Sequence, residues 1–271
     1  MAETSGNSGN DMMTFGGHLE VFRHLLFRVL GVTIVLAVVV FCFKEQTFNM
    51  LMAPSHWDFV TYRWIENIIQ ATGSDFHFSQ FHVNMIATEL SSQFMTHIST
   101  AFYLGLLGTS PYMLYELFRF VSPALYDNER KYAVKIVVTV YILFIIGVLM
   151  TYYVLFPVSF RFLGTYNVSE EVVSNITLDS YISTFTSLTL VMGLVFQLPV
   201  LAFFLARMGA INKSMLTHYR KHAFIIIMIV AAIITPPDVM TLFLVSAPLY
   251  LLYELSIKVV KWAQKKQIHN N

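Results

Sequence analysis

Charged residues are scarce in this 271-residue chain, at 12%, whereas hydrophobic residues make up 56% and the mean hydropathy is +0.62. Soluble domains average about 25% charged residues, so this composition excludes an ordinary soluble protein. A bilayer core about 30 Å thick needs roughly 20 apolar residues as a helix. Several uncharged stretches reach or approach that length, and we therefore interpret the chain as an all-α membrane protein.

Patterns that carry enzyme chemistry are also missing. The one cysteine, Cys42, allows neither an intramolecular disulfide nor a cysteine-based zinc site. Zinc-protease, nucleophile-elbow and phosphate-loop motifs do not occur. His218 and His222 are spaced by four residues but have no third ligand nearby in the sequence. We expect no enzyme activity, no catalytic residues, no metal or other cofactor and no nucleic-acid partner.

Six apolar segments are predicted to span the membrane. They cover approximately residues 25–43, 94–118, 136–157, 181–206, 223–235 and 239–260. The fifth segment would form a helix only about 20 Å long, well short of the bilayer core. Its shortness predicts local thinning of the bilayer or shielding behind other helices, unless the helix is longer than the apolar run.

The basic residues are distributed unevenly along the chain. If the N-terminus is cytoplasmic, only Lys44, Arg63 and Arg161 of the 17 Lys and Arg residues fall in external segments. Because Lys and Arg collect in cytoplasmic loops, we predict that both termini are cytoplasmic. The predicted transmembrane domain covers residues 18–262, between a disordered tail of residues 1–17 and a second tail of residues 263–271.

The longest predicted external segment covers residues 44–93. Trp64, Ile65, Ile68 and Ile69 alternate there with polar residues. This pattern is typical of amphipathic helices that lie at the membrane interface, and we expect such helices to cap the bundle.

Prolines and glycines mark the expected helix ends. Pro157 is predicted to end the third span, and Gly209 follows the fourth. Two consecutive prolines lie in the run Thr235–Asp238. Because each proline lacks an N–H and restricts the preceding residue, this run predicts a tight external turn between the fifth and sixth spans.

Polar residues inside the spans are candidates for function, because they are costly in lipid. Gln197 is the clearest, and Pro199 is predicted to kink its helix. On a helix, Gln197 shares one stripe with Asp179, Ser183, Thr186, Thr189 and Gly193. That stripe faces a cavity or a partner, or it mediates close helix packing. Glu254 is predicted to pair with Lys258, one turn later.

A cytoplasmic loop separates the second and third predicted spans. In it an aromatic residue, Phe120, precedes an acidic residue, Glu129. The carboxylate of Glu129 can pair with Arg119, Arg130 or Lys131 of the same loop. It is equally suited to bind an arginine of a basic peptide through charge-assisted hydrogen bonds.

Several motifs together resemble the TatC family, the multispanning subunit of the twin-arginine protein translocase. They are His18-Leu19 with Arg23, the run from Phe120 to Lys131, Phe196 to Val200 (FQLPV), Thr235 to Asp238 (TPPD) and Leu252 to Glu254 (LYE). The resemblance extends over nearly the whole chain, apart from the tail and residues 44–93.

The resemblance implies a six-helix receptor for the twin-arginine signal peptides of folded proteins. It further implies single-span TatA- or TatB-type partner subunits, possible homo-oligomers, transport driven by the proton-motive force, and a multi-pass location in the bacterial cytoplasmic (inner) membrane. The implied signal-peptide site comprises Glu129, Phe120, Arg23 and Glu20. The implied intramembrane polar or partner-contacting residues are Gln197, Thr235, Asp238 and Glu254.

Three positions depart from the pattern of this family. Val21 stands where a glutamate is usual, and Glu20 precedes it. Gln197 stands where many members carry glutamate, so hydrogen bonding remains but ionisation is lost. After Asp238, Thr241-Leu242 replaces a common Ser-Gln pair.

Two other classes of membrane protein compete with this interpretation. A small-solute secondary transporter would also have six spans and intramembrane polar residues. Such folds often contain two similar halves, but the Pro-Pro break of the second half has no counterpart in the first. An intramembrane protease would need a nucleophile or metal set that the sequence lacks.

Overall fold

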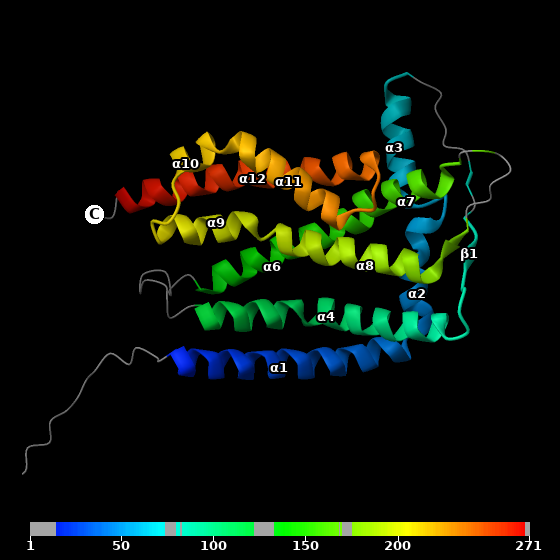
Figure 1. Cartoon of the computed structure of the whole chain (residues 1–271), viewed down its shortest axis with the longest axis horizontal. Helices are drawn as coiled ribbons and strands as arrows, with labels where there is room; N and C mark the ends of the chain where they lie inside the picture. Colours follow the sequence, from blue (N-terminus) through cyan, green and yellow to red (C-terminus); the bar gives the residue numbers. More distant parts are fainter. Residues whose placement is uncertain are drawn as a thin grey trace, which may run out of the picture.

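A computed structural model describes residues 15–73, 80, 81, 83–121, 133–167, 169 and 175–268 of the chain. These residues form a bundle of long helices with a smaller cap at one end (Figure 1). The prediction of an all-α membrane protein is confirmed for this part of the chain, apart from one pair of two-residue strands.

Long helical units correspond to the six predicted spans. They are α1 (Phe15–Cys42), α4 (Ser92–Val121), α6 (Ala133–Met150) with the π-helix η3 (Thr151–Leu155) and α7 (Phe156–Thr165), α8 (Leu178–Val195) with α9 (Leu198–Arg207), α11 (Arg220–Ile234) and α12 (Val239–Ile268). Residues 19–42, 136–165, 178–207 and 239–265 are long and apolar enough to cross a membrane by length and composition alone. The fifth unit, α11, has 15 residues and a length of about 22 Å.

The remaining elements connect these units. They are α2 (Lys44–Met52), the 3-10 helix η1 (Ala53–Ser55), α3 (Val60–Ala71), β1 (Met85–Ile86), β2 (Ile176–Thr177) and α10 (Lys213–His218). The two strands pair in parallel, with Met85 opposite Ile176. They join the connection before α4 to the connection between α7 and α8, and no sequence pattern predicted them.

The two ends of the bundle differ in charge. The start of α1, the end of α4 and the end of α12 lie together at one end, which we call the basic end; α2, α3 and β1 lie at the opposite end, the cap end (Figure 1). The basic end carries Arg23, Arg28, Arg119, Arg207, Lys213, Arg220, Lys221 and Lys265. The first and last described helices therefore both reach the basic end, which supports the predicted topology with both termini cytoplasmic.

The helix of the third span continues past its predicted end at Pro157. It reaches Thr165, because η3 forms a wider turn just before the proline, which lies in the first turn of α7. Proline cannot donate to the carbonyl four residues earlier, that of Tyr153. The hydroxyl of Thr61 in α3 donates to that carbonyl instead, so a contact from the cap stabilises the continuation.

Other predicted helix boundaries agree with the structure. The helix of the fourth span is interrupted at Phe196 and Gln197, and Pro199 lies in the first turn of α9, which confirms the predicted kink. Gly209, with φ of 76°, follows the end of α9. The run Thr235–Asp238 forms the predicted turn between α11 and α12.

Both predicted tails are partly helical. α1 begins at Phe15, within the tail predicted for residues 1–17, and α12 continues to Ile268, beyond the predicted end of the sixth span. The disorder predicted for residues 1–14 concerns a segment outside the described residues.

α1 is attached to the bundle chiefly through α4. Gly105 of α4 lies so close to α1 that a Cβ at this position would be 2.8 Å from the Thr33 carbonyl oxygen and 2.8 Å from the Ala37 nitrogen. The Thr33 hydroxyl lies 3.2 Å from that of Thr109, across the same contact. Small residues and shared hydroxyls are the usual means of close helix packing in membranes.

Candidate functional site

The basic end brings the start of α1 against the end of α4. The rings of Phe22 and Phe120 lie 5.6 Å apart between centroids, at an angle of 51°, and Phe120 is half-buried. Phe120 therefore has a defined position at the junction of the two helices. Glu129, the acidic residue predicted to act with it, lies outside the described residues.

The other two predicted signal-site residues lie on α1 beside this aromatic contact. Arg23 directly follows Phe22, and its side chain is exposed. Glu20 is also exposed, with its Oε1 atom 3.9 Å from Nε2 of His24. The structure thus brings Arg23 and Glu20 near the end of α4 and leaves both accessible from the basic end.

A buried acid of α4 was missed by the sequence reasoning. Glu116 is only 6% exposed, and its Oε2 atom lies 3.7 Å from Nη1 of Arg28 in α1. It precedes Phe120 by one helical turn. The signal was available, because Glu116 is an ionisable residue inside the predicted second span, and such residues are functional candidates by default.

Gln197 lies at the interruption between α8 and α9. Its Nε2 atom donates to the carbonyl of Gly193 at 3.3 Å, whereas its Oε1 atom is buried without a hydrogen-bond partner among the described residues. The rest of the predicted stripe does not share one environment. Thr189 and Gly193 are buried, and a Cβ on Gly193 would lie 2.6 Å from the Phe144 ring of α6, whereas Ser183 is exposed.

Thr189 and Gly193 therefore mediate helix packing. The buried oxygen of Gln197 remains the candidate of this stripe for binding a partner. A carboxamide oxygen without a partner in an apolar setting is costly, and it gains most from a donor supplied by another chain.

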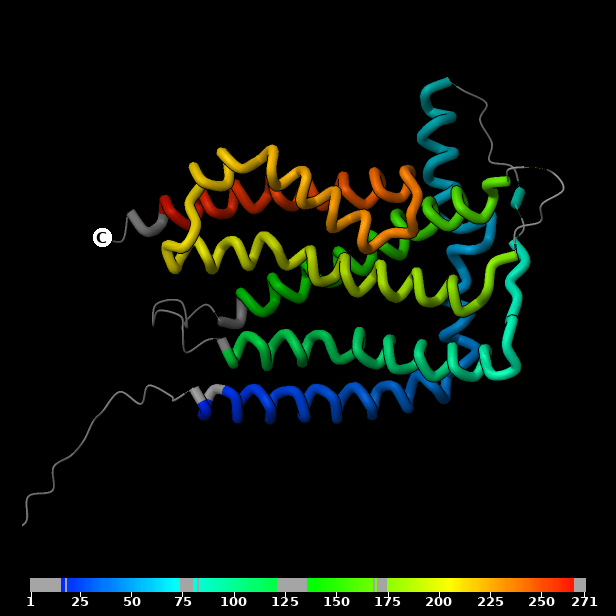
Figure 2. Tube along the Cα trace, in the orientation of Figure 1, coloured from blue at the N-terminus to red at the C-terminus, as the bar shows by residue number. Residues whose placement is uncertain are grey.

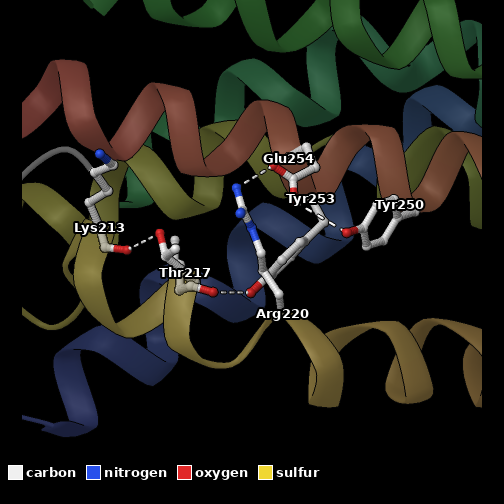
Figure 3. A network of polar contacts seen from close by, with 7 residues as sticks. Lys213, Thr217, Arg220, Tyr250, Tyr253 and Glu254 are labelled. Carbon is white, nitrogen blue, oxygen red and sulfur yellow. Dashed lines mark hydrogen bonds and ion pairs between the residues drawn. The ribbon is translucent and has the colours of Figure 1, made fainter.

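Glu254 has a different partner from the predicted one. Its Oε2 atom accepts a hydrogen bond from Nη2 of Arg220 at 2.8 Å, rather than pairing with Lys258 on its own helix. Figure 3 shows Arg220 of α11 reaching across to Glu254 of α12. The Tyr250 hydroxyl donates to Oε1 of Glu254 at 3.3 Å, so both carboxylate oxygens have partners.

The same network holds α10 against α12. The hydroxyl of Tyr253 donates to the Leu216 carbonyl at 2.6 Å, and the backbone N–H of Lys213 donates to Oε1 of Gln264 at 3.3 Å. Within α10, the hydroxyl of Thr217 donates to the Lys213 carbonyl at 2.8 Å (Figure 3). We therefore assign Glu254 a role in joining α11 to α12 at the basic end.

The opposite end of this helix pair carries Thr235 and Asp238. Thr235 is buried, and its hydroxyl donates to the Ala231 carbonyl at 2.9 Å. Oδ1 of Asp238 accepts from the backbone N–H of Thr241 at 2.6 Å, which caps the start of α12. Oδ2 of Asp238 is buried without a hydrogen-bond partner within the described ranges.

A cavity of about 690 Å³ adjoins this turn. It lies between α7, α8 and the end of α11, and its lining includes Thr235 and the hydroxyl residues Ser159, Ser180, Ser183, Thr184 and Ser187. Among the residues that the structure describes, no charged side chain lines it. The described part of the cavity therefore gives the short fifth helix a polar neighbour.

Comparisons with known proteins show the family of the chain. The family model described as Sec-independent protein translocase protein (TatC) matches residues 17–248. The TatC protein of Blattabacterium sp. subsp. Periplaneta americana is 33% identical over 265 residues, covering 96% of this chain and 99% of the relative. The TatC protein of Campylobacter jejuni is 31% identical over 244 residues, covering 90% and 92%.

A solved structure shares the fold over nearly its whole length. The crystal structure of the twin-arginine translocase receptor TatC has a TM-score of 0.72 and 27% sequence identity, and it covers 91% of this chain and 99% of that one. The chain therefore belongs to the TatC family of Sec-independent protein translocases.

Proposed function

We propose that this protein is the signal-peptide receptor of a twin-arginine translocase in the cytoplasmic (inner) membrane of a bacterium. It binds the twin-arginine signal peptides of folded proteins at the basic end and is not an enzyme. The observation that carries the proposal is the contact between Phe22 of α1 and Phe120 of α4. It brings the exposed Arg23 and Glu20 beside the end of α4, from which the loop with Glu129 continues.

Each residue of this site has a distinct role in the proposal. The carboxylate of Glu129 binds an arginine of the signal peptide, and Phe120 offers an apolar contact beside it. Glu20 adds a second exposed carboxylate on α1. Arg23 repels a peptide cation that approaches in the wrong register, which favours one alignment of the paired arginines.

The test compares two acidic residues of the same loop. A charged hydrogen bond contributes about 1.5–3 kcal/mol, and 1.4 kcal/mol is roughly tenfold in affinity. Glu129→Gln should therefore weaken binding of a labelled twin-arginine peptide to the purified protein by about tenfold or more. Asp127→Asn is the matched control and should matter much less.

Two results would contradict this assignment. Equal losses for both variants would mean general attraction by negative charge, and equal binding of a Lys-Lys peptide would mean that arginine is not recognised. Loss of the folded Glu129→Gln protein would instead assign Glu129 a structural ion pair.

We further propose that single-span TatA- or TatB-type subunits dock beside the polar residues of the spans. The Gln197 oxygen, which has no hydrogen-bond partner among the described residues, and the hydroxyl-lined cavity beside Thr235 support this proposal. Asp238 and Glu254 act indirectly, because Asp238 caps the start of α12 and Glu254 joins α12 to α11 through Arg220. Transport is driven by the proton-motive force, and oligomers of the receptor are part of the proposal.

A further inference from the structure

The helix α3 at the cap end presents an apolar stripe that no described residue covers. Val60, Trp64 and Ile68 recur every four residues and therefore lie along one side of the helix. They are 49%, 68% and 66% exposed. Three large apolar side chains are thus exposed side by side. Exposed apolar patches on proteins mark sites of interaction.

The other sides of α3 are different in character. Thr61 and Tyr62 are buried against the bundle, and the polar side carries Arg63, Glu66, Asn67 and Gln70. Going round the helix, the stripe therefore lies between a buried side and a polar side. This order is typical of a helix that lies along a boundary between an apolar and an aqueous phase.

α3 is held firmly in its position. The hydroxyl of Tyr62 donates to the Pro157 carbonyl at 2.8 Å, and the hydroxyl of Thr61 donates to the Tyr153 carbonyl. The ring of Phe59, just before the helix, stacks on Tyr153 with centroids 5.9 Å apart. Burial raises the pKa of Tyr62, so its hydroxyl keeps its proton and remains a donor.

These contacts attach α3 to the outer part of a membrane span. Tyr153 and Val154, on the segment 136–165, are 43% and 41% exposed. An exposed apolar side chain on such a segment faces lipid in a membrane. Phe59 and Thr61, the neighbours of Val60 in the sequence, both contact Tyr153, so the stripe begins beside this exposed part of the span. α3 itself runs across the direction of the spans (Figures 1 and 2).

We propose that α3 lies in the outer interface of the bilayer, with Val60, Trp64 and Ile68 inserted at the boundary between headgroups and acyl chains. A helix that runs across the spans lies along the membrane plane. Trp is the side chain that best suits this boundary, because its ring is apolar and its N–H is polar. Arg63 on the polar side is exposed at the headgroup level, with its Nη2 atom 3.8 Å from Oδ2 of Asp58.

This arrangement gives the cap a second attachment to the membrane, besides its covalent links to α1 and α4. It sets the depth at which the cap lies, because the stripe and the spans must meet the same bilayer boundary. The bilayer interface, rather than a second copy of the chain, is the occupant that the continuity with Tyr153 and Val154 favours.

The experiment uses tryptophan as the reporter. The chain contains three tryptophans, so Trp57→Phe with Trp262→Phe leaves Trp64 as the single fluorophore. The full-length protein is reconstituted into vesicles of phosphatidylcholine brominated on the acyl chain near the headgroup. Trp64 should lose most of its emission relative to unbrominated vesicles and should emit at shorter wavelength than in water.

The matched control moves the fluorophore to the polar side of the same helix. Trp64→Phe with Gln70→Trp, in the same background, places the fluorophore about 120° around the helix from Trp64 and should retain its emission in brominated vesicles. The proposal is overturned if Trp64 is not quenched, or if both positions are quenched equally. It is also overturned if an Ile68→Cys variant, in a Cys42→Ser background, forms disulfide-linked dimers in the membrane, because a second copy would then cover the stripe.

Discussion

Gly105 is the position at which one added methyl group tests how α1 is held. In Gly105→Ala the new Cβ would lie 2.8 Å from two backbone atoms of α1. Ordinary carbon contacts are about 3.5–4.0 Å. No side-chain rotation relieves this overlap, since both opposing atoms belong to the backbone, so α1 must move away from α4.

The expected cost follows from this displacement. Overpacking of a well-packed contact costs about 1–3 kcal/mol. The Thr33–Thr109 contact, at 3.2 Å, would lengthen as well. Each kcal/mol lowers Tm by roughly 2–4 °C in chains of this size, so the apparent Tm in detergent should fall by about 5 °C. Because α1 also carries Arg23, binding of the twin-arginine peptide should weaken up to about tenfold.

The control is the same substitution three residues later on the same helix. In Gly108→Ala the new Cβ would lie 3.3 Å from Cδ1 of Leu36, the end of a flexible side chain. Its apparent Tm and peptide affinity should stay close to those of the parent protein. If Gly105→Ala kept both values, or if the two variants lost stability equally, the close contact between α1 and α4 would not hold α1 as described.

Three further predictions concern the membrane domain. Gln197→Leu should impair export and crosslinking to the single-span partner more than Gln197→Glu, because Leu removes the buried acceptor. Unchanged export in Gln197→Leu would mean that Gln197 only contributes to helix packing. Glu254→Gln should destabilise the protein by about 1 kcal/mol, since the pair with Arg220 is partly exposed, whereas Lys258→Gln should have little effect on a denaturation midpoint. In a Cys42→Ser background, an impermeant thiol reagent applied to intact cells should modify a Ser74→Cys variant and leave an Asn128→Cys variant unmodified. The reverse result would mean that the topology is opposite to the one predicted.

Local features of the sequence predicted much of this fold. Membrane spans contain long apolar runs, so the six helical units could be predicted from the sequence without knowledge of any tertiary contact. The turn at Thr235–Asp238 was recognisable for a similar reason, because two prolines stop a helix in any context. The resemblance on short motifs, such as the run from Phe120, pointed to the family that the comparisons show.

Features that depend on distant residues were not predictable in this way. Pro157 looked like a helix end, but Thr61, far away in the sequence, supplies the missing hydrogen-bond partner. Glu254 has a lysine one turn away, yet it pairs with Arg220, 34 residues away, because the two helices converge there. Glu116 could have been found, but its pairing with Arg28 depends on how α1 meets α4.

The α11–α12 hairpin has a consequence for how the chain is made. With 15 residues, α11 is too short to cross a bilayer stably by itself. At its first residue, Arg220 pairs with Glu254 of α12, and at its other end the turn Thr235–Asp238 leads directly into α12. We therefore expect α11 to enter the membrane together with the 30-residue α12 rather than before it. A nascent chain that stops after Ile234 should accordingly leave its fifth helix outside the bilayer.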